Sequence, residues 1–101
     1  MSILALDEVI NMARDTRRCE EYVIARGAIV EFLLQDSKIK FIPKEVYRYL
    51  EISKQTLSHA LKIIPKYRQH NCYIHCLESL RHNEEVFVEQ VNQYLDSKKP
   101  L

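Results

Sequence analysis

The sequence predicts a mainly α-helical protein that forms a single domain over residues 1–101. Apolar residues recur every three or four positions along most of the chain, which is the spacing of one buried helix face. The length of 101 residues suits one hydrophobic core, and an apolar fraction of 47% is sufficient to build it. A single glycine and three prolines leave few places for tight turns.

Two helices are predicted in the N-terminal part of the chain. The first covers residues 3–14 and has an apolar stripe of Ile3, Leu6, Val9, Ile10 and Ala13. The second covers about 20–35, with a stripe of Tyr22, Ala25, Ile29, Phe32 and Leu33. Gly27 lies inside this second helix, where glycine costs about 1 kcal/mol relative to alanine. A glycine at this position indicates close packing against another helix.

The helical period breaks at residues 37–42, where lysines alternate with apolar residues. This alternation predicts a very short strand. Pro43 suits the first turn of a helix over about 43–51, because its missing N–H is no loss there. Ser53 is a suitable N-cap for a further helix over about 53–64. The buried residues of the first of these helices are expected to be Val46, Leu50 and either Tyr49 or Tyr47.

Residues 66–82 allow two interpretations, and periodicity alone does not decide between them. In the first, residues 66–69 and 72–75 are the strands of a hairpin with a turn at His70-Asn71. In the second, the asparagine caps a helix with a stripe of Ile74, Leu77 and Leu80.

A last helix is predicted over about 84–97. Asn83 caps it, and Glu84 and Glu85 are favourably placed at its positive end. Its apolar stripe consists of Phe87, Val91, Tyr94 and Leu95. This helix and the two N-terminal helices flank the central part of the chain, and they are the expected surfaces for dimer formation.

Positive charge is concentrated between Lys38 and His70. The segment contains two acids, Glu45 and Glu51, against eight bases, which gives a net charge of +6. The rest of the chain has seven bases and twelve acids, a net charge of −5. A basic block in an otherwise acidic domain indicates a surface for a polyanion, although a solvated surface with clustered charges would give the same pattern. The eight bases are Lys38, Lys40, Lys44, Arg48, Lys54, Lys62, Lys66 and Arg68.

Residues 45–62, with the sequence EVYRYLEISKQTLSHALK, resemble the helix-turn-helix motif of bacterial and archaeal DNA-binding proteins. The likeness is closest from Ile52, which closes the turn, through Ser53, which caps the second helix, to Leu61. It covers less than a fifth of the chain. The resemblance implies a helix-turn-helix core over about 43–64 that N-terminal and C-terminal helices flank.

Two positions depart from the helix-turn-helix pattern. Tyr47 stands where the family usually has a small residue, and Glu51 stands where it usually has glycine. The first departure implies a different crossing of the two helices. The second implies either a non-glycine residue in the left-handed conformation or a turn of altered shape. The order of elements also resembles a winged helix domain, in which the hairpin interpretation makes residues 66–76 the wing.

The second helix of this segment has an outer face that suits DNA. Apolar residues are expected at the crossing of the two helices, namely Val46, Leu50, Ile52, Leu57 and Leu61. Its glutamine suits an adenine edge, and its lysines suit phosphate groups. Lys44 and Arg48 on the preceding helix are expected to contact the DNA backbone, and Arg68 joins them from the wing. The outer face itself consists of Ser53, Lys54, Gln55, Ser58, His59 and Lys62.

His70, Cys72, His75 and Cys76 lie within seven residues and are of the types that zinc favours. Four ligands from one short segment would, however, be geometrically strained. The alternative is that both cysteines are small buried apolar residues and both histidines are polar surface groups. No metal or other cofactor is therefore predicted.

The sequence favours a small DNA-binding protein, with transcriptional regulation as its function and a second copy of the chain as a partner. It lacks glycine-rich phosphate loops and a catalytic constellation, so an enzyme is not expected. The chain turns acidic at Asp7 and has no long apolar run, which predicts a cytoplasmic location away from the membrane. The alternative is a non-catalytic accessory subunit or protein-interaction adaptor of a nucleic-acid-processing complex. Its partner would lie on the two-helix face or on the stripe of Phe87 and Val91.

Overall fold

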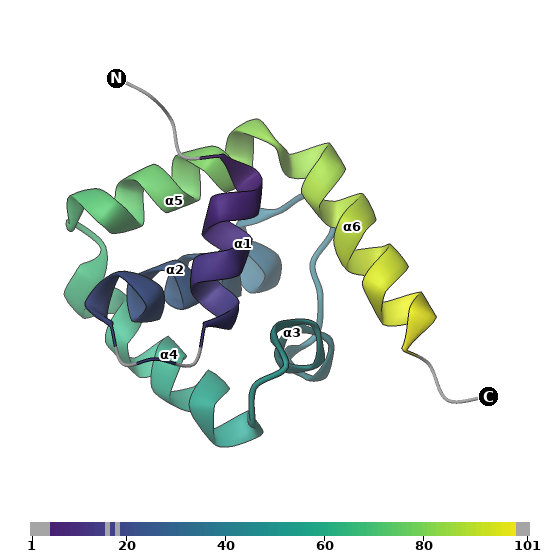
Figure 1. Cartoon of the computed structure of the whole chain (residues 1–101), viewed down its shortest axis with the longest axis horizontal. Coiled ribbons are helices and arrows are strands. Elements are labelled where there is room, and N and C mark those ends of the chain that lie inside the picture. Colours follow the sequence, from purple (N-terminus) through teal and green to yellow (C-terminus); the bar gives the residue numbers. More distant parts are fainter. Residues whose placement is uncertain (1–4, 16, 18, 99–101) are drawn as a thin grey trace.

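The computed structural model describes residues 5–15, 17 and 19–98, and every regular element in that part of the chain is a helix (Figure 1). The prediction of a mainly α-helical protein is therefore confirmed. Residues 3 and 4, with which the first predicted helix begins, lie outside the described residues. No helix within the described ranges combines the length and the apolar character needed to cross a bilayer. The elements are α1 (Leu6–Arg14), α2 (Glu20–Glu31), the π-helical η1 (Phe32–Asp36), α3 (Pro43–Leu50), α4 (Lys54–Tyr67), α5 (Asn71–His82) and α6 (Glu84–Ser97).

Helix α2 lies at the centre of the molecule. The helices α1, α4 and α5 all pack against it, and Figure 1 shows it crossed by α1 with α4 and α5 on either side. Its residues from Ile24 to Val30 are buried, apart from the half-buried Arg26. A helix that is apolar on almost every side has to be enclosed by other elements. The hydrophobic core is therefore organised around α2.

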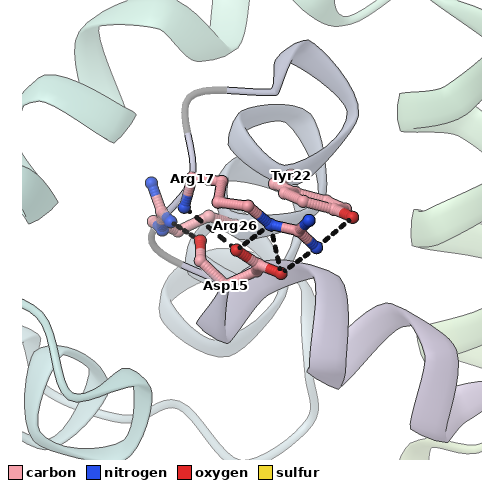
Figure 2. A network of polar contacts seen from close by, with 4 residues as sticks. All are labelled: Asp15, Arg17, Tyr22 and Arg26. Carbon is pink, nitrogen blue, oxygen red and sulfur yellow. Dashed lines mark hydrogen bonds and ion pairs between the residues drawn. The ribbon is translucent and has the colours of Figure 1, made fainter.

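Side-chain hydrogen bonds hold the turn between α1 and α2 (Figure 2). The Arg17 guanidinium donates to the Asp15 carboxylate at 2.8 to 3.2 Å and to the Tyr22 hydroxyl at 3.0 Å. These hydrogen bonds lower the pKa of Asp15. Arg26 donates to the carbonyl oxygens of Ala13 at 3.0 Å and of Asp15 at 2.8 Å. A side chain of α2 thus satisfies carbonyl groups that the end of α1 leaves unpaired.

After α2 the chain makes the wide turn η1 and continues through the connector, residues 37–42. The Ser37 N–H donates to the Phe32 carbonyl at 2.8 Å, and the Phe41 N–H donates to the Leu33 carbonyl at 3.0 Å. The short strand predicted in this connector is wrong, because it pairs with no other described segment. The reason is that a strand is stable only beside a partner strand, and this helical fold offers none.

The chain forms helices where the hairpin interpretation placed a wing. Helix α4 continues through Pro65 to Tyr67, and α5 begins at Asn71, so residues 66–76 hold a helix end, a short turn and a helix start. The winged interpretation is therefore wrong, and the prediction of a helix in this region is confirmed, although His70 caps this helix in place of Asn71. Pro65 is tolerated near the end of α4, where it removes a single backbone hydrogen bond. Packing in the core decides the outcome, because the buried residues of α5 are Tyr73, Cys76, Ser79 and Leu80, whereas Ile74 of the predicted stripe is 38% exposed.

Gly27 faces both α4 and α5, as its position inside a buried helix indicates. A β-carbon added there would lie 3.7 Å from Ile64 Cγ1 and 4.0 Å from the Tyr73 ring, which is ordinary van der Waals contact. We expect Gly27→Ala to raise the free energy of unfolding by about 0.5–1 kcal/mol, because alanine loses less backbone entropy on folding. Urea denaturation followed by circular dichroism measures this. Gly27→Leu is the matched control and should lower the free energy of unfolding. If Gly27→Ala also lowered it, Ile64 could not shift to make room for the β-carbon.

Helix α6 turns its apolar stripe into the molecule. Phe87, Val88 and Val91 are buried as α6 packs against α3 and α5. The Phe87 ring centre lies 5.9 Å from that of Phe32 and 5.9 Å from that of Tyr49. The expectation that Phe87 and Val91 form a partner surface is therefore wrong, because the core of the same chain covers both side chains.

Candidate functional site

Helices α3 and α4 follow one another across a connection of three residues, 51–53. Helix α3 buries Val46, Tyr49 and Leu50, whereas Tyr47 is only half-buried. This resolves the choice between the two tyrosines in favour of Tyr49. On α4, Leu61 was expected at the crossing but is 37% exposed, and Ile64 is buried in its place. The buried residues of α4 are Leu57, Ala60 and Ile64.

Glu51 ends α3 in the left-handed conformation, with φ 57° and ψ 42°. Its N–H donates to the Arg48 carbonyl at 3.2 Å, and the Ile52 N–H donates to the Tyr47 carbonyl at 3.0 Å. These bonds satisfy carbonyl groups at the end of α3 in the way that a glycine usually does. The sequence left two alternatives for Glu51, which stands where helix-turn-helix motifs usually have glycine: a left-handed residue or a turn of altered shape. The structure has the left-handed residue.

The left-handed backbone at Glu51 gives a stability prediction. A side chain in this conformation costs roughly 1 kcal/mol, which glycine avoids. The Glu51 carboxylate also interacts electrostatically with Tyr94, whose pKa it raises, so a single variant would mix two effects. We therefore expect Glu51→Gly to be more stable than Glu51→Ala by about 1 kcal/mol in thermal unfolding. Equal stability of the two variants would contradict backbone strain at this turn.

Ser53 caps α4, as predicted. Its hydroxyl oxygen accepts from the Thr56 N–H at 3.0 Å and lies 2.8 Å from Thr56 Oγ1. The backbone at Ser53 is extended, which is typical of an N-cap residue. This hydroxyl is therefore engaged in fixing the start of α4, and Ser53 contributes to the candidate surface by placing that helix end.

The polar residues predicted on the outside of α4 lie together on its exposed face. Five of them line one shallow groove with a volume of about 320 Å³, and no carboxylate is among the lining residues. Sequence reasoning missed Lys66, because Pro65 was expected to end the helix. Since α4 continues to Tyr67, Lys66 follows Lys62 by one turn and extends the same row. The five groove residues are Lys54, Gln55, Ser58, His59 and Lys62.

Three other predicted contact residues lie outside this groove. Lys44 and Arg48 are exposed on α3, one helical turn apart and directly before the turn to α4. Arg68 follows the end of α4, and its guanidinium lies 3.5 Å from the Glu31 carboxylate of α2. Its contact with α2 places Arg68 apart from the α4 groove, so its predicted role in a wing is wrong.

The two cysteine side chains of α5 and the histidine that precedes this helix have roles in the fold. Burial raises the pKa of the Cys76 thiol to about 12, and burial also raises that of Cys72, which is half-buried. His70 caps α5, because its Nδ1 accepts from the Cys72 N–H at 3.1 Å. Within the described ranges, no group of three or more histidine, cysteine, aspartate or glutamate side chains has an arrangement suited to a metal ion.

Comparisons of the chain with protein-family models, with curated proteins and with solved structures found no match.

Proposed function

We propose that this protein binds duplex DNA through the exposed face of α4 and acts as a small transcriptional regulator. The observation that carries the proposal is the groove on α4, where two lysines flank glutamine, serine and histidine side chains and no acid lines the surface. The groove lies within the segment of net charge +6. Positive charge supplies the affinity of a protein for DNA, and polar side chains on a protruding helix supply the reading of base edges.

Each groove residue has a role that its chemistry suits. Lys54 lies at the start of α4 and Lys62 two turns later, so both can meet phosphates along one strand. Between them, Gln55 can make a bidentate contact with adenine, and Ser58 and His59 can donate to or accept from base edges. The first turn of α4 also presents backbone N–H groups, which favour a phosphate oxygen.

Glu51 is compatible with a DNA surface although it carries a negative charge beside the basic helix. Burial and the negative charge of nearby Glu51 raise the pKa of Tyr94 of α6. The acid therefore lies close enough to α6 to interact with Tyr94. The acid therefore does not belong to the groove on α4.

The test is binding to mixed-sequence duplex DNA, measured by fluorescence anisotropy across a salt series. We expect Lys54→Glu with Lys62→Glu to weaken binding on the order of 100-fold at low salt. The slope of log affinity against log salt should fall by about two, since two phosphate contacts are lost.

A matched control carries the same change in net charge elsewhere. Lys40→Glu with Lys98→Glu replaces two exposed lysines that lie outside α4, and it should retain most of the affinity. Equal losses in both double variants would assign the binding to overall charge and not to α4. Absence of salt-dependent binding by the unaltered protein would reject the proposal.

A further inference from the structure

A groove with a volume of about 940 Å³ runs along the outer face of α6. The connector and the end of α5 form its other wall, and the Lys38 N–H donates to the Glu84 carboxylate at 3.0 Å, which ties the connector to the start of α6. In Figure 1, α6 forms the right-hand side of the molecule and α4 lies at the lower left. The α6 groove shares no lining residue with the groove on α4. It is therefore a second, separate surface.

Two exposed apolar side chains line the α6 groove. Ile39 of the connector is 57% exposed, and Val86 of α6 is 52% exposed. Single exposed apolar residues are common on protein surfaces, but two that line one groove form a patch that contact with a partner removes from water. Neither side chain belongs to the hydrophobic core of the chain.

Four carboxylates line the α6 groove, and three of them lie in one row along the helix. Glu85, Glu89 and Asp96 are four and seven residues apart, and these spacings return a side chain to the same side of a helix. Glu89 accepts a hydrogen bond from the Gln93 side-chain amide at 3.2 Å, and Glu84 accepts from a backbone N–H. Both donors are neutral and leave the carboxylate charge in place. The wall formed by α6 is therefore acidic over about three helical turns.

The bases in the α6 groove do not balance these acids. The Arg81 guanidinium makes a bidentate ion pair at 2.8 and 3.0 Å with Asp36, which does not line the groove. With histidine counted as neutral, Lys38 is the base that remains among the lining residues to oppose four carboxylates. The α6 groove therefore has a net negative charge around its apolar patch, whereas the groove on α4 is basic.

A helix suits the α6 groove better than an added strand does. A strand would have to pair with the backbone of the connector, where the N–H groups of Ser37, Lys38 and Phe41 already donate within the chain. A helix needs no free backbone groups, because it binds through the side chains of one face. The acidic row also runs parallel to α6, so its length matches about three turns of a bound helix.

We propose that the α6 groove binds a basic amphipathic helix of a partner protein. The apolar stripe of that helix covers Ile39 and Val86, and lysine or arginine side chains beside the stripe pair with Glu85 and Glu89. The same negative charge repels DNA, and two copies of the chain that met groove to groove would bring like charges together. The inference does not depend on DNA binding by α4.

The first test uses the apolar patch. The probe is a fluorescein-labelled synthetic peptide of leucine and lysine, with leucine at every third or fourth position, and fluorescence anisotropy measures its binding. We expect saturable binding to the unaltered protein, and Val86→Asn should weaken it about fivefold. Ile42→Asn is the matched control, because Ile42 is also 57% exposed but does not line the groove. Circular dichroism checks that both variants fold. An equal loss of affinity in the two variants would overturn the proposal.

The second test uses the charge of the α6 groove and the same peptide. Glu85→Lys with Glu89→Lys should weaken binding about tenfold or more, because lysine would then face lysine. Glu8→Lys with Glu21→Lys is the matched control, since it makes the same change in net charge at exposed residues of α1 and α2. The control should retain most of the affinity. Equal losses in the two double variants would assign the binding to overall charge and contradict a site on α6.

The remaining outcomes identify other occupants and separate this proposal from DNA binding. Self-association of the unaltered protein in sedimentation equilibrium, if Val86→Asn abolished it, would place a second copy in the groove and overturn the proposal. No binding of the peptide at protein concentrations up to about 1 mM would also overturn it. Lys54→Glu with Lys62→Glu should lose DNA but retain the peptide, so either proposal can fail while the other holds.

Discussion

Replacement of Phe87 by alanine is expected to lower the free energy of unfolding by about 3–5 kcal/mol. Phe87 is fully buried, and its ring lies between those of Phe32 and Tyr49 at 5.9 Å from each centre. It therefore joins α6 to η1 and to α3 through one side chain. The alanine variant loses this burial and the contacts with both rings, and it leaves a cavity that the surrounding helices fill only in part.

Urea denaturation at a fixed protein concentration measures the effect of Phe87→Ala. Gln93→Ala is the matched control on the same helix, because Gln93 is exposed and its loss should change stability by no more than about 0.5 kcal/mol. A loss below about 1 kcal/mol for Phe87→Ala would mean that this ring does not hold α6 to the core.

Replacement of Arg14 by alanine should cost about 2–3 kcal/mol, although Arg14 is only half-buried. Its Nη2 donates to the Tyr49 carbonyl oxygen at 2.9 Å, close to the end of α3, where helical carbonyls lack partners. The same guanidinium lies 4.5 Å from the centre of the Tyr49 ring and 4.7 Å from that of Tyr94. One side chain of α1 thus makes a hydrogen bond and two cation–π contacts with α3 and α6.

Arg14→Lys distinguishes charge from shape at this position. A lysine ammonium keeps the charge, but it lacks the planar guanidinium that contacts both rings while it donates to a carbonyl oxygen. We expect lysine to recover less than half of the stability lost in the alanine variant. Thermal unfolding of the three proteins gives the comparison, and full recovery by lysine would show that the planar geometry is unimportant.

Local patterns predicted most of the helices and part of the candidate surface. Three- and four-residue spacing was sufficient for α1, α2 and α6, and Ser53 located the start of α4 because capping depends on adjacent residues. The place of Glu51 in the turn left two alternatives, a left-handed residue or a turn of altered shape, and the first is the one found. The outer residues of α4 followed from the same reasoning, since the exposed face of a helix is the complement of its apolar stripe.

Errors arose where distant parts of the chain decide the structure. The alternation at 37–42 lacks a partner strand, and no local pattern reveals that absence. Periodicity did not separate a hairpin from α5, where packing of Tyr73 and Cys76 in the core decides. Likewise, the burial of Ile64 in place of Leu61 depends on how α4 crosses α2, and the burial of the α6 stripe depends on the whole chain.

The central position of α2 determines the order in which parts of the molecule unfold. Amide hydrogens between Ile24 and Val30 are enclosed by α1, α4 and α5, so they should exchange with solvent only when the entire domain unfolds. Helix α6 lies at the edge and is held mainly by Phe87 and its neighbours, and 14 residues are too few for a stable isolated helix. Its amides should therefore exchange through local detachment while α2 remains protected.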